Sequence, residues 1–335
     1  MAENSKLKLL YILDIMKKTD EFHPLNATQI AALLEQYGIT AERKSISRDI
    51  ACLEEKGYSI LKCADHNKGW YMTDQTFEDY ELKILCDAVS MAPFLTENDT
   101  RELIRKLRGL ATKEGESVIS ATTYVDQSIK TEDKGNKIKI DTVLRAIVGR
   151  KKLRFQYYEL GPRNQKVLKR DGHVYSVSPY YLVLSQGEYY LIANPDSHDH
   201  LTHFKLEMLK DPEIIQEPIR NPESLEEYGK DFDVGTYLRR NVKMWTGENV
   251  TVRLRCSNYI RDQIRIQFGK DTWVQDDGPD HCIVSVNVTG STGLYQWLAQ
   301  HGTQVQVLSP EKVRQQYVQY LRDTLELQET LEETR

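Results

Sequence analysis

The chain has 335 residues and a formal net charge of -5. This length exceeds what one ordinary hydrophobic core serves, so we expect two or three domains. No apolar run is long enough to span a membrane, and the N-terminus lacks the apolar core of a signal peptide. The sequence therefore predicts a cytoplasmic protein without a membrane partner. Its five scattered cysteines contain no C-x-x-C pair and predict free thiols rather than disulfides or a zinc site.

Residues 1–75 read as three helices followed by a hairpin. Apolar residues recur at helical spacing over 6–18. Asn26 and Gln29 then form a capping-box pattern that opens a second helix, and Gly38 stops that helix. A third helix follows after a short turn, and two short strand-like runs follow the helix. This order predicts a winged helix-turn-helix domain.

Cationic side chains occupy one side of the third helix, over residues 40–58. Apolar residues at i, i+4 and i+7 define the opposite, buried side: Ile46, Ile50 and Leu53. The second helix of a helix-turn-helix enters the major groove, where long cations suit guanine edges and phosphates and serines suit phosphate oxygens. The candidate DNA-binding residues are therefore Arg43, Lys44, Ser45, Ser47 and Arg48, with Lys68 in the wing. The alternative is an ordinary solvated helix, because acidic and basic residues balance over 1–72.

Residues 76–136 predict a helical connector or a dimerising helix pair. The helical pattern covers 77–130 in two pieces, which Pro93 and the following polar stretch separate. The polar segment 130–137 is typical of a linker.

Within residues 137–218, one helix is predicted at 138–150. After this helix the pattern of apolar residues becomes that of β-strands. Several short runs separated by turn residues predict a small, strongly bent sheet or barrel. Lysine and arginine greatly outnumber aspartate and glutamate over 134–173, and tyrosine pairs recur in the strands. Exposed aromatic rings among cations suit a nucleotide or a short single strand, although half-buried strand tyrosines explain the same pattern.

Residues 219–335 predict a second α+β domain, in which strands and helices alternate up to a closing helix that begins near Pro310. The whole chain is thus predicted to be α+β and multidomain.

Catalytic and metal-binding signatures are weak. The sequence lacks a nucleophile elbow, a phosphate-binding loop, a dinucleotide fingerprint and an H-E-x-x-H motif. His198, His200 and His203 form the one metal-like cluster, but the aspartates and proline around them favour a polar turn. We therefore expect no enzyme activity, no catalytic residues, no cofactor and no bound metal.

Several segments resemble the WYL-domain transcriptional regulators. "ERKSISRDIACLEEKGY" is similar to their recognition helix and wing entry. "VSPYYLVLSQGEYYLIAN" resembles the segment that names the WYL domain, with Tyr189 in the place of the usual tryptophan, and "HFKLEMLKD" resembles the following strand. "FGKDTWV", "LYQWLAQHG" and "VQVLSPEKVR" are similar to the C-terminal WCX-type extension of the family.

The resemblance implies a ligand-responsive regulator with an Sm-like β-barrel, homodimers, a DNA operator and a nucleotide or single-stranded nucleic acid as effector. Matching the motif-bearing strands gives seven candidate effector residues: His173, Tyr175, Ser178, Tyr180, Tyr190, His203 and Lys205. Met208 stands where the family often has a cation. The alternative function is a nucleic-acid-binding accessory protein without sequence preference.

Overall fold

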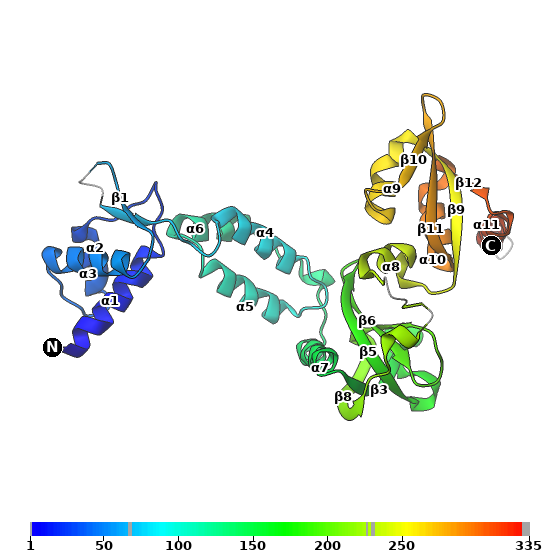
Figure 1. Ribbon diagram of the computed structural model, residues 1–335, viewed down its shortest axis with the longest axis horizontal. Helices are drawn as coiled ribbons and strands as arrows, with labels where there is room; N and C mark the ends of the chain where they lie inside the picture. Colours follow the sequence, from blue (N-terminus) through cyan, green and yellow to red (C-terminus); the bar gives the residue numbers. More distant parts are fainter. Residues whose placement is uncertain (1, 66–68, 226, 229–231, 330–335) are drawn as a thin grey trace. The chain divides into compact units, whose positions relative to one another are not determined.

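The computed structural model describes residues 2–65, 69–225, 227–228 and 232–329, and the chain forms two compact units, Met1–Lys134 and Gly135–Arg335 (Figure 1). The described part is α+β and contains eleven α-helices and three sheets. None of the described helices is both long and apolar enough to cross a bilayer.

The first unit opens with three helices around one core. They are α1 (Ala2–Met16), α2 (Ala27–Glu35) and α3 (Arg43–Glu55). The expected capping box is present, because the Asn26 side chain accepts from the backbone of Thr28 and Gln29 while the Gln29 side chain accepts from Asn26 N–H. One apolar stripe from each helix is buried in a common cluster that includes Ile12, Met16, Ile30, Leu34, Ile46 and Ile50. The apolar period of α3 predicted this side correctly.

An antiparallel hairpin follows the three helices. Its strands are β1 (Ile60–Lys62) and β2 (Trp70–Met72). Leu25 adds a third segment, since its backbone N–H and C=O both bond to Trp70 at 2.9 Å. A Cβ on Gly69 would lie 2.0 Å from the Leu25 carbonyl oxygen, so this close approach requires glycine. The hairpin is thereby attached to the turn between α1 and α2.

Three further helices complete the first unit: α4 (Asp79–Ser90), α5 (Glu97–Arg108) and α6 (Lys113–Thr122). The expected second helical piece is therefore two helices. At the break, the Thr112 hydroxyl caps α6 by accepting from Gly115 N–H. Asp79 holds this turn by accepting from both the backbone and the hydroxyl of Thr112, at 3.0 and 2.6 Å.

The second unit begins with helix α7 (Asn136–Val148), which packs on an antiparallel sheet. The strands of the sheet are β3 (Lys151–Leu160), β4 (Lys166–Leu168), β5 (Val174–Ser185), β6 (Glu188–Pro195), β7 (Thr202–Lys205) and β8 (Leu209–Pro218). The strand order is β4-β3-β5-β6-β7, and β8 also pairs with β3.

The expected closed barrel is not found in the described residues, because no ladder joins β7 to β8 or β4. Strand β8 extends beyond the predicted strand-like runs and contains Pro212. The ladder accommodates this proline at a register shift opposite Arg154 and Gln156, where Asp211 adopts a positive φ of 49°.

The two faces of this sheet serve different cores. One face carries Phe155, Val177, Leu191 and Phe204 and packs with helix α7. The other face carries Tyr180, Val183 and Ile192, which pack with residues of the segment 219–244 such as Leu225 and Tyr237. A short helix in that segment, α8 (Val234–Arg240), leads into the C-terminal domain.

The last domain repeats a strand–helix–strand pattern. Its elements are β9 (Glu248–Ser257), α9 (Arg261–Phe268), β10 (Trp273–Asp276), β11 (His281–Gly290), α10 (Thr292–His301), β12 (Val305–Ser309) and α11 (Glu311–Glu329). The sheet order is β10-β11-β9-β12. Ile264 of α9, Trp297 of α10 and Tyr317 of α11 share one core with the inward valines of β11. All five cysteines of the chain are free.

Candidate nucleic-acid interface and effector site

The side of α3 opposite the core is exposed and cationic. Arg43, Lys44 and Arg48 are all exposed, while Ile46 and Ile50 on the other side are almost fully buried. None of the three cations forms an ion pair or a side-chain hydrogen bond with any residue that the structure describes. Their charges are therefore available to an external anion.

The two serines of α3 are already engaged. Ser45 Oγ accepts from Lys8 Nζ of α1 at 2.5 Å, and the same ammonium lies 2.8 Å from Asp49. Ser47 Oγ donates to the Arg43 carbonyl one turn earlier, at 3.1 Å. This back-bond is local and leaves the hydroxyl on the helix surface. Ser45 thus helps to attach α3 to α1.

The hairpin carries one cation that sequence reasoning missed. Lys62 of β1 is exposed, and its Nζ lies 5.9 Å from the ring centroid of Trp70 on the facing strand. The spacing of the strand run placed Lys62 in the hairpin but offered no reason to single it out. Lys68, the wing residue that was singled out, lies outside the described residues.

In the second unit, Tyr190 and Lys205 face each other across β6 and β7. Both contact Glu188, which the sequence prediction did not include. Lys205 Nζ lies 2.5 Å from one Glu188 oxygen, and Tyr190 donates to the other at 3.0 Å. Glu188 stands two positions before Tyr190, so alternation in a strand places both on one face. The candidate cation is therefore neutralised from within the sheet.

His203 is on the same face but is buried against the segment that follows the sheet. Its Nδ1 lies 2.7 Å from the Met244 carbonyl and its Nε2 lies 2.8 Å from the Tyr237 hydroxyl. The carbonyl can only accept, so Nδ1 carries the proton and the tyrosine donates to Nε2. Burial lowers the pKa of His203, because it disfavours the imidazolium. His203 therefore joins the sheet to α8 as a neutral ring.

Ser178 and Tyr180 are also covered by this segment. Ser178 Oγ accepts from Arg220 N–H at 2.9 Å, and the Tyr180 hydroxyl donates to the Arg220 carbonyl at 3.1 Å. Both residues are buried, at 0% and 7% relative exposure. Their polar groups are used to hold the covering segment.

His173 and Tyr175 belong to the opposite face. Their rings pack edge to face at 4.8 Å, next to Tyr157. The Tyr157 hydroxyl accepts from Lys205 N–H at 3.0 Å, and Lys169 Nζ lies 5.9 Å from its ring centroid. Burial raises the pKa of Tyr157 to about 12, so its hydroxyl stays protonated. The seven predicted residues therefore fall into two groups, of which five lie on the covered face.

Much of the basic run is paired with carboxylates from neighbouring strands. Lys152 contacts Asp196 at 2.9 Å and Glu217 at 3.3 Å, and Arg154 contacts Glu213 at 3.0 Å. The Asp196 hydrogen bond raises the pKa of Lys152. Met208, which replaces the family's frequent cation, is buried at 9% exposure. The positive field predicted from the sequence is accordingly reduced on this sheet.

The histidines of the polar turn do not assemble into a metal site. The rings of His198 and His200 lie 6.0 Å apart, and His200 pairs with Glu227 at 3.4 Å. His203 points to Tyr237 instead. Across the described part of the chain, no group of three or more His, Cys, Asp and Glu side chains is placed to hold a metal ion.

Comparison with known proteins identifies two domains in the second unit. The WYL domain model matches residues 139–214, and the WCX domain model matches residues 248–325. No curated protein matches the chain.

Two solved structures resemble it weakly. Proteasome accessory factor B/C (PafBC) of Arthrobacter aurescens aligns over 92% of this chain and 47% of its own length, at 18% identity and a TM-score of 0.28. The chain thus spans about half the length of PafBC. A CRISPR Cas-related protein aligns over 77% of this chain and 75% of its own, at 13% identity and a TM-score of 0.38. The two domain matches show that the chain carries a WYL domain followed by a WCX domain.

Proposed function

We propose that the protein is a ligand-responsive, DNA-binding transcriptional regulator. The observation that carries this proposal is the exposed, unpaired set of cations on α3: Arg43, Lys44 and Arg48. In an acidic chain, a helix face on which three cations have no carboxylate partner among the described residues is suited to a polyanion. The WYL domain adds support at the level of the family.

The order of elements in the first unit supports a winged helix-turn-helix. Helices α2 and α3 share a core with α1, and the hairpin follows α3 directly. In this arrangement α3 enters the major groove, where Arg48 reaches base edges while Arg43 and Lys44 contact phosphates. Lys62 in the hairpin adds a phosphate contact. A homodimer of such heads would bind two half-sites, in the cytoplasm where the DNA is.

The WYL domain would sense an anionic effector, a nucleotide or a short single strand. The accessible candidates are Lys205 and Tyr190 on one face, and His173 with Tyr175 on the other. Ser178, Tyr180 and His203 would act by holding the segment 219–244, which the effector must disturb to change the position of the C-terminal domain. Such a response requires the effector to bind one arrangement better than the other.

Selection of bound duplexes from a random DNA pool tests the DNA-binding half. We expect enrichment of a two-fold symmetric site, and its loss with Arg48→Ala. Arg105→Ala is the matched control, because Arg105 is an exposed arginine of α5 in the same unit, without an ion pair to a described residue. Enrichment that is unchanged by Arg48→Ala would contradict the assigned recognition helix. Uniform weakening without any site preference would favour the accessory-protein alternative.

A titration of operator affinity with short single-stranded oligonucleotides tests the sensing half. We expect the affinity to change by at least several-fold in the wild type and to respond less in Lys205→Gln. An operator affinity that stays constant with every nucleotide and oligonucleotide tried would refute the proposed effector class and leave the DNA-binding half intact.

A further inference from the structure

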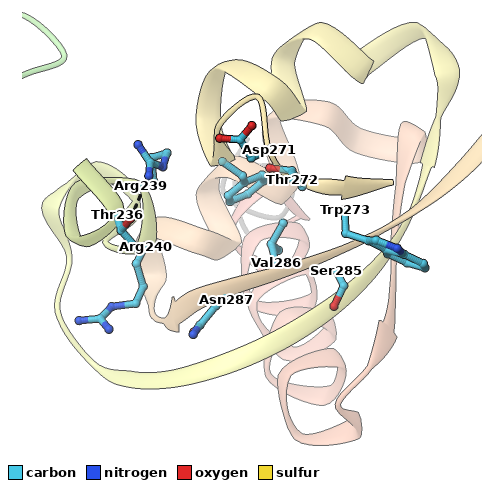
Figure 2. A pocket seen from close by; sticks show the side chains of 10 residues that line it. Thr236, Arg239, Arg240, Asp271, Thr272, Trp273, Ser285, Val286 and Asn287 are labelled. Carbon is cyan, nitrogen blue, oxygen red and sulfur yellow. Dashed lines mark hydrogen bonds between the residues drawn. The ribbon is translucent and has the colours of Figure 1, made fainter. Parts of the chain in front are cut away.

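A pocket of about 370 Å³ lies between α8 and the WCX domain. Helix α8 supplies Thr236, Arg239 and Arg240 on one side, and the loop after α9 supplies Asp271 and Thr272 on the other (Figure 2). This volume lies within the range of small-molecule sites, about 300–1,000 Å³. The pocket contains none of the predicted effector residues.

The pocket exists because two strands of the WCX sheet differ in length. Strand β10 begins at Trp273, which pairs with Ser285, whereas β11 continues to Gly290. Beyond Ser285 the outer edge of β11 has no β10 partner, and Asn287 of this stretch lines the pocket. Helix α8, and not a further strand, packs near this edge, and the space between them stays open.

The two arginines are only partly compensated. Arg239 donates to the Thr236 hydroxyl at 2.9 Å, and its nearest carboxylate, Asp233, is 3.9 Å away. A Cβ on Gly269 would lie 3.1 Å from Arg239 Cδ, so glycine there lets the arginine cross the loop.

Arg240 lies 5.4 Å above the Tyr237 ring and forms no ion pair with a described residue. Its Nε is buried and has no hydrogen-bond partner in the described part of the chain. A buried donor without a partner is uncommon in folded proteins and indicates a position where an additional acceptor would be favourable.

We propose that this pocket binds the phosphate and base of a single nucleotide, free or at the end of a strand. The arginines suit a phosphate, because planar guanidinium groups donate pairs of hydrogen bonds to its oxygens. Phe268 and Trp273 also line the pocket and offer aromatic surface to a base. Asp271 and Asn287 supply an acceptor and an amide for base or ribose groups. Among the residues that line the pocket, one carboxylate stands against two guanidinium groups.

The pocket shares helix α8 with the WYL sheet. Tyr237 of α8 donates to His203, while Arg239 and Arg240 on the same helix line the pocket. A nucleotide that holds these arginines therefore restrains the element that covers the WYL face. Binding itself does not depend on the proposed regulation of DNA.

Binding of adenosine 5′-monophosphate to the full chain tests the site, by calorimetry and by the fluorescence of the half-exposed Trp273. We expect saturable binding with a fluorescence change. The affinity should fall at least about ten-fold in Arg239→Gln and further in the Arg239→Gln/Arg240→Gln variant. Adenosine and inorganic phosphate separately should bind more weakly, and a 5′-phosphorylated single strand distinguishes a free nucleotide from a strand end.

Two further variants locate the binding. Arg265→Gln removes an exposed arginine of α9 that does not line the pocket, and it should keep wild-type affinity. In the Lys205→Gln background, which alters the candidate WYL site, Arg239→Gln should still lower the affinity. The single Arg239→Gln variant keeps the test valid if loss of the Arg240–Tyr237 contact unfolds α8. The proposal is overturned if the nucleotide does not bind, if Arg239→Gln binds it like the wild type, or if Arg239→Gln has no effect on affinity in the Lys205→Gln background.

Discussion

Helix α3 and the WYL sheet are both rich in basic residues in the sequence. In the fold, the cations of α3 remain unpaired with any described residue, whereas several of those of the sheet form ion pairs. On α3, Arg43, Lys44 and Arg48 have no acidic partner among the described residues. On the sheet, Lys152, Arg154 and Lys205 each contact a carboxylate from the same or another strand.

Backbone geometry explains the difference. Neighbours on the exposed face of a helix lie three or four positions apart, so the charge of the exposed face of α3 depends mainly on its own sequence. A sheet brings together residues far apart in the chain, so acids at 196, 213 and 217 compensate a run that looked strongly basic. A local excess of positive charge therefore predicts an anion-binding surface more reliably on a helix than on a sheet.

Removing charge from α3 should have the largest effect. Arg43→Ala/Arg48→Ala should weaken binding to the selected DNA by about 100-fold, because a base contact and a phosphate contact are both lost. The slope of log affinity against log salt should become shallower by about one, since one phosphate contact disappears. Fluorescence anisotropy at several salt concentrations measures both values. Arg105→Ala should change neither, and equal loss in that control would show that α3 is not the interface.

Removing the buried His203 should have the second-largest effect. His203→Leu leaves the Met244 carbonyl and the Tyr237 hydroxyl without their partner, which should cost about 2 kcal/mol in the free energy of unfolding. Urea unfolding followed by tyrosine fluorescence measures this loss. His198→Leu is the control, because His198 is exposed in the polar turn, and it should leave stability nearly unchanged.

The same pair of variants tests the pH dependence. The pKa of His203 is lowered in the fold, so below its ordinary value of about 6.5 the unfolded chain binds a proton that the folded chain does not. The free energy of unfolding of the wild type should therefore fall as the pH drops from 7 toward 5. The free energy of unfolding of His203→Leu should fall less over the same range. An identical pH slope in both proteins would contradict the neutral, buried ring.

Removing the carboxylate beside Lys205 should have a smaller effect. Glu188→Gln should tighten binding of a phosphorylated single strand about five-fold, because the ammonium loses its internal partner. This prediction depends on the proposed effector site. Calorimetry in the Arg239→Gln background removes the contribution of binding at the pocket beside α8. Glu213→Gln, which frees Arg154 instead, should leave the affinity unchanged, and weaker binding by Glu188→Gln would argue against an anion at Lys205.

The smallest effect is expected at the exposed pair of Arg154 and Glu213, whose side chains are 51% and 62% exposed. Solvent screens such pairs, so Arg154→Ala should change the free energy of unfolding by no more than about 0.5 kcal/mol. A double-mutant cycle with Glu213→Ala measures the coupling. A coupling well above 1 kcal/mol would mean that the sheet depends on its ion pairs for stability.

Local patterns predicted much of the fold. Three local features could be predicted from the sequence: the capping box at Asn26, the apolar stripe of α3 and the change to a strand period after α7. Each depends on residues within a few positions of one another. Strand β8 was not predicted, because its pairing with β3 joins residues more than fifty positions apart. The break before α6 was missed because it depends on Asp79, more than thirty positions away from Thr112.

The candidate sites divide in the same way. By itself, the sequence determined which side of α3 faces water, since helical periodicity is a local property. Only the tertiary structure decided that His203 and Ser178 are covered, that Glu188 neutralises Lys205, and that Arg239, Arg240 and Asp271 line one pocket. These contacts join residues that are distant along the chain, and their energies depend on burial and long-range pairing, which one sequence does not specify.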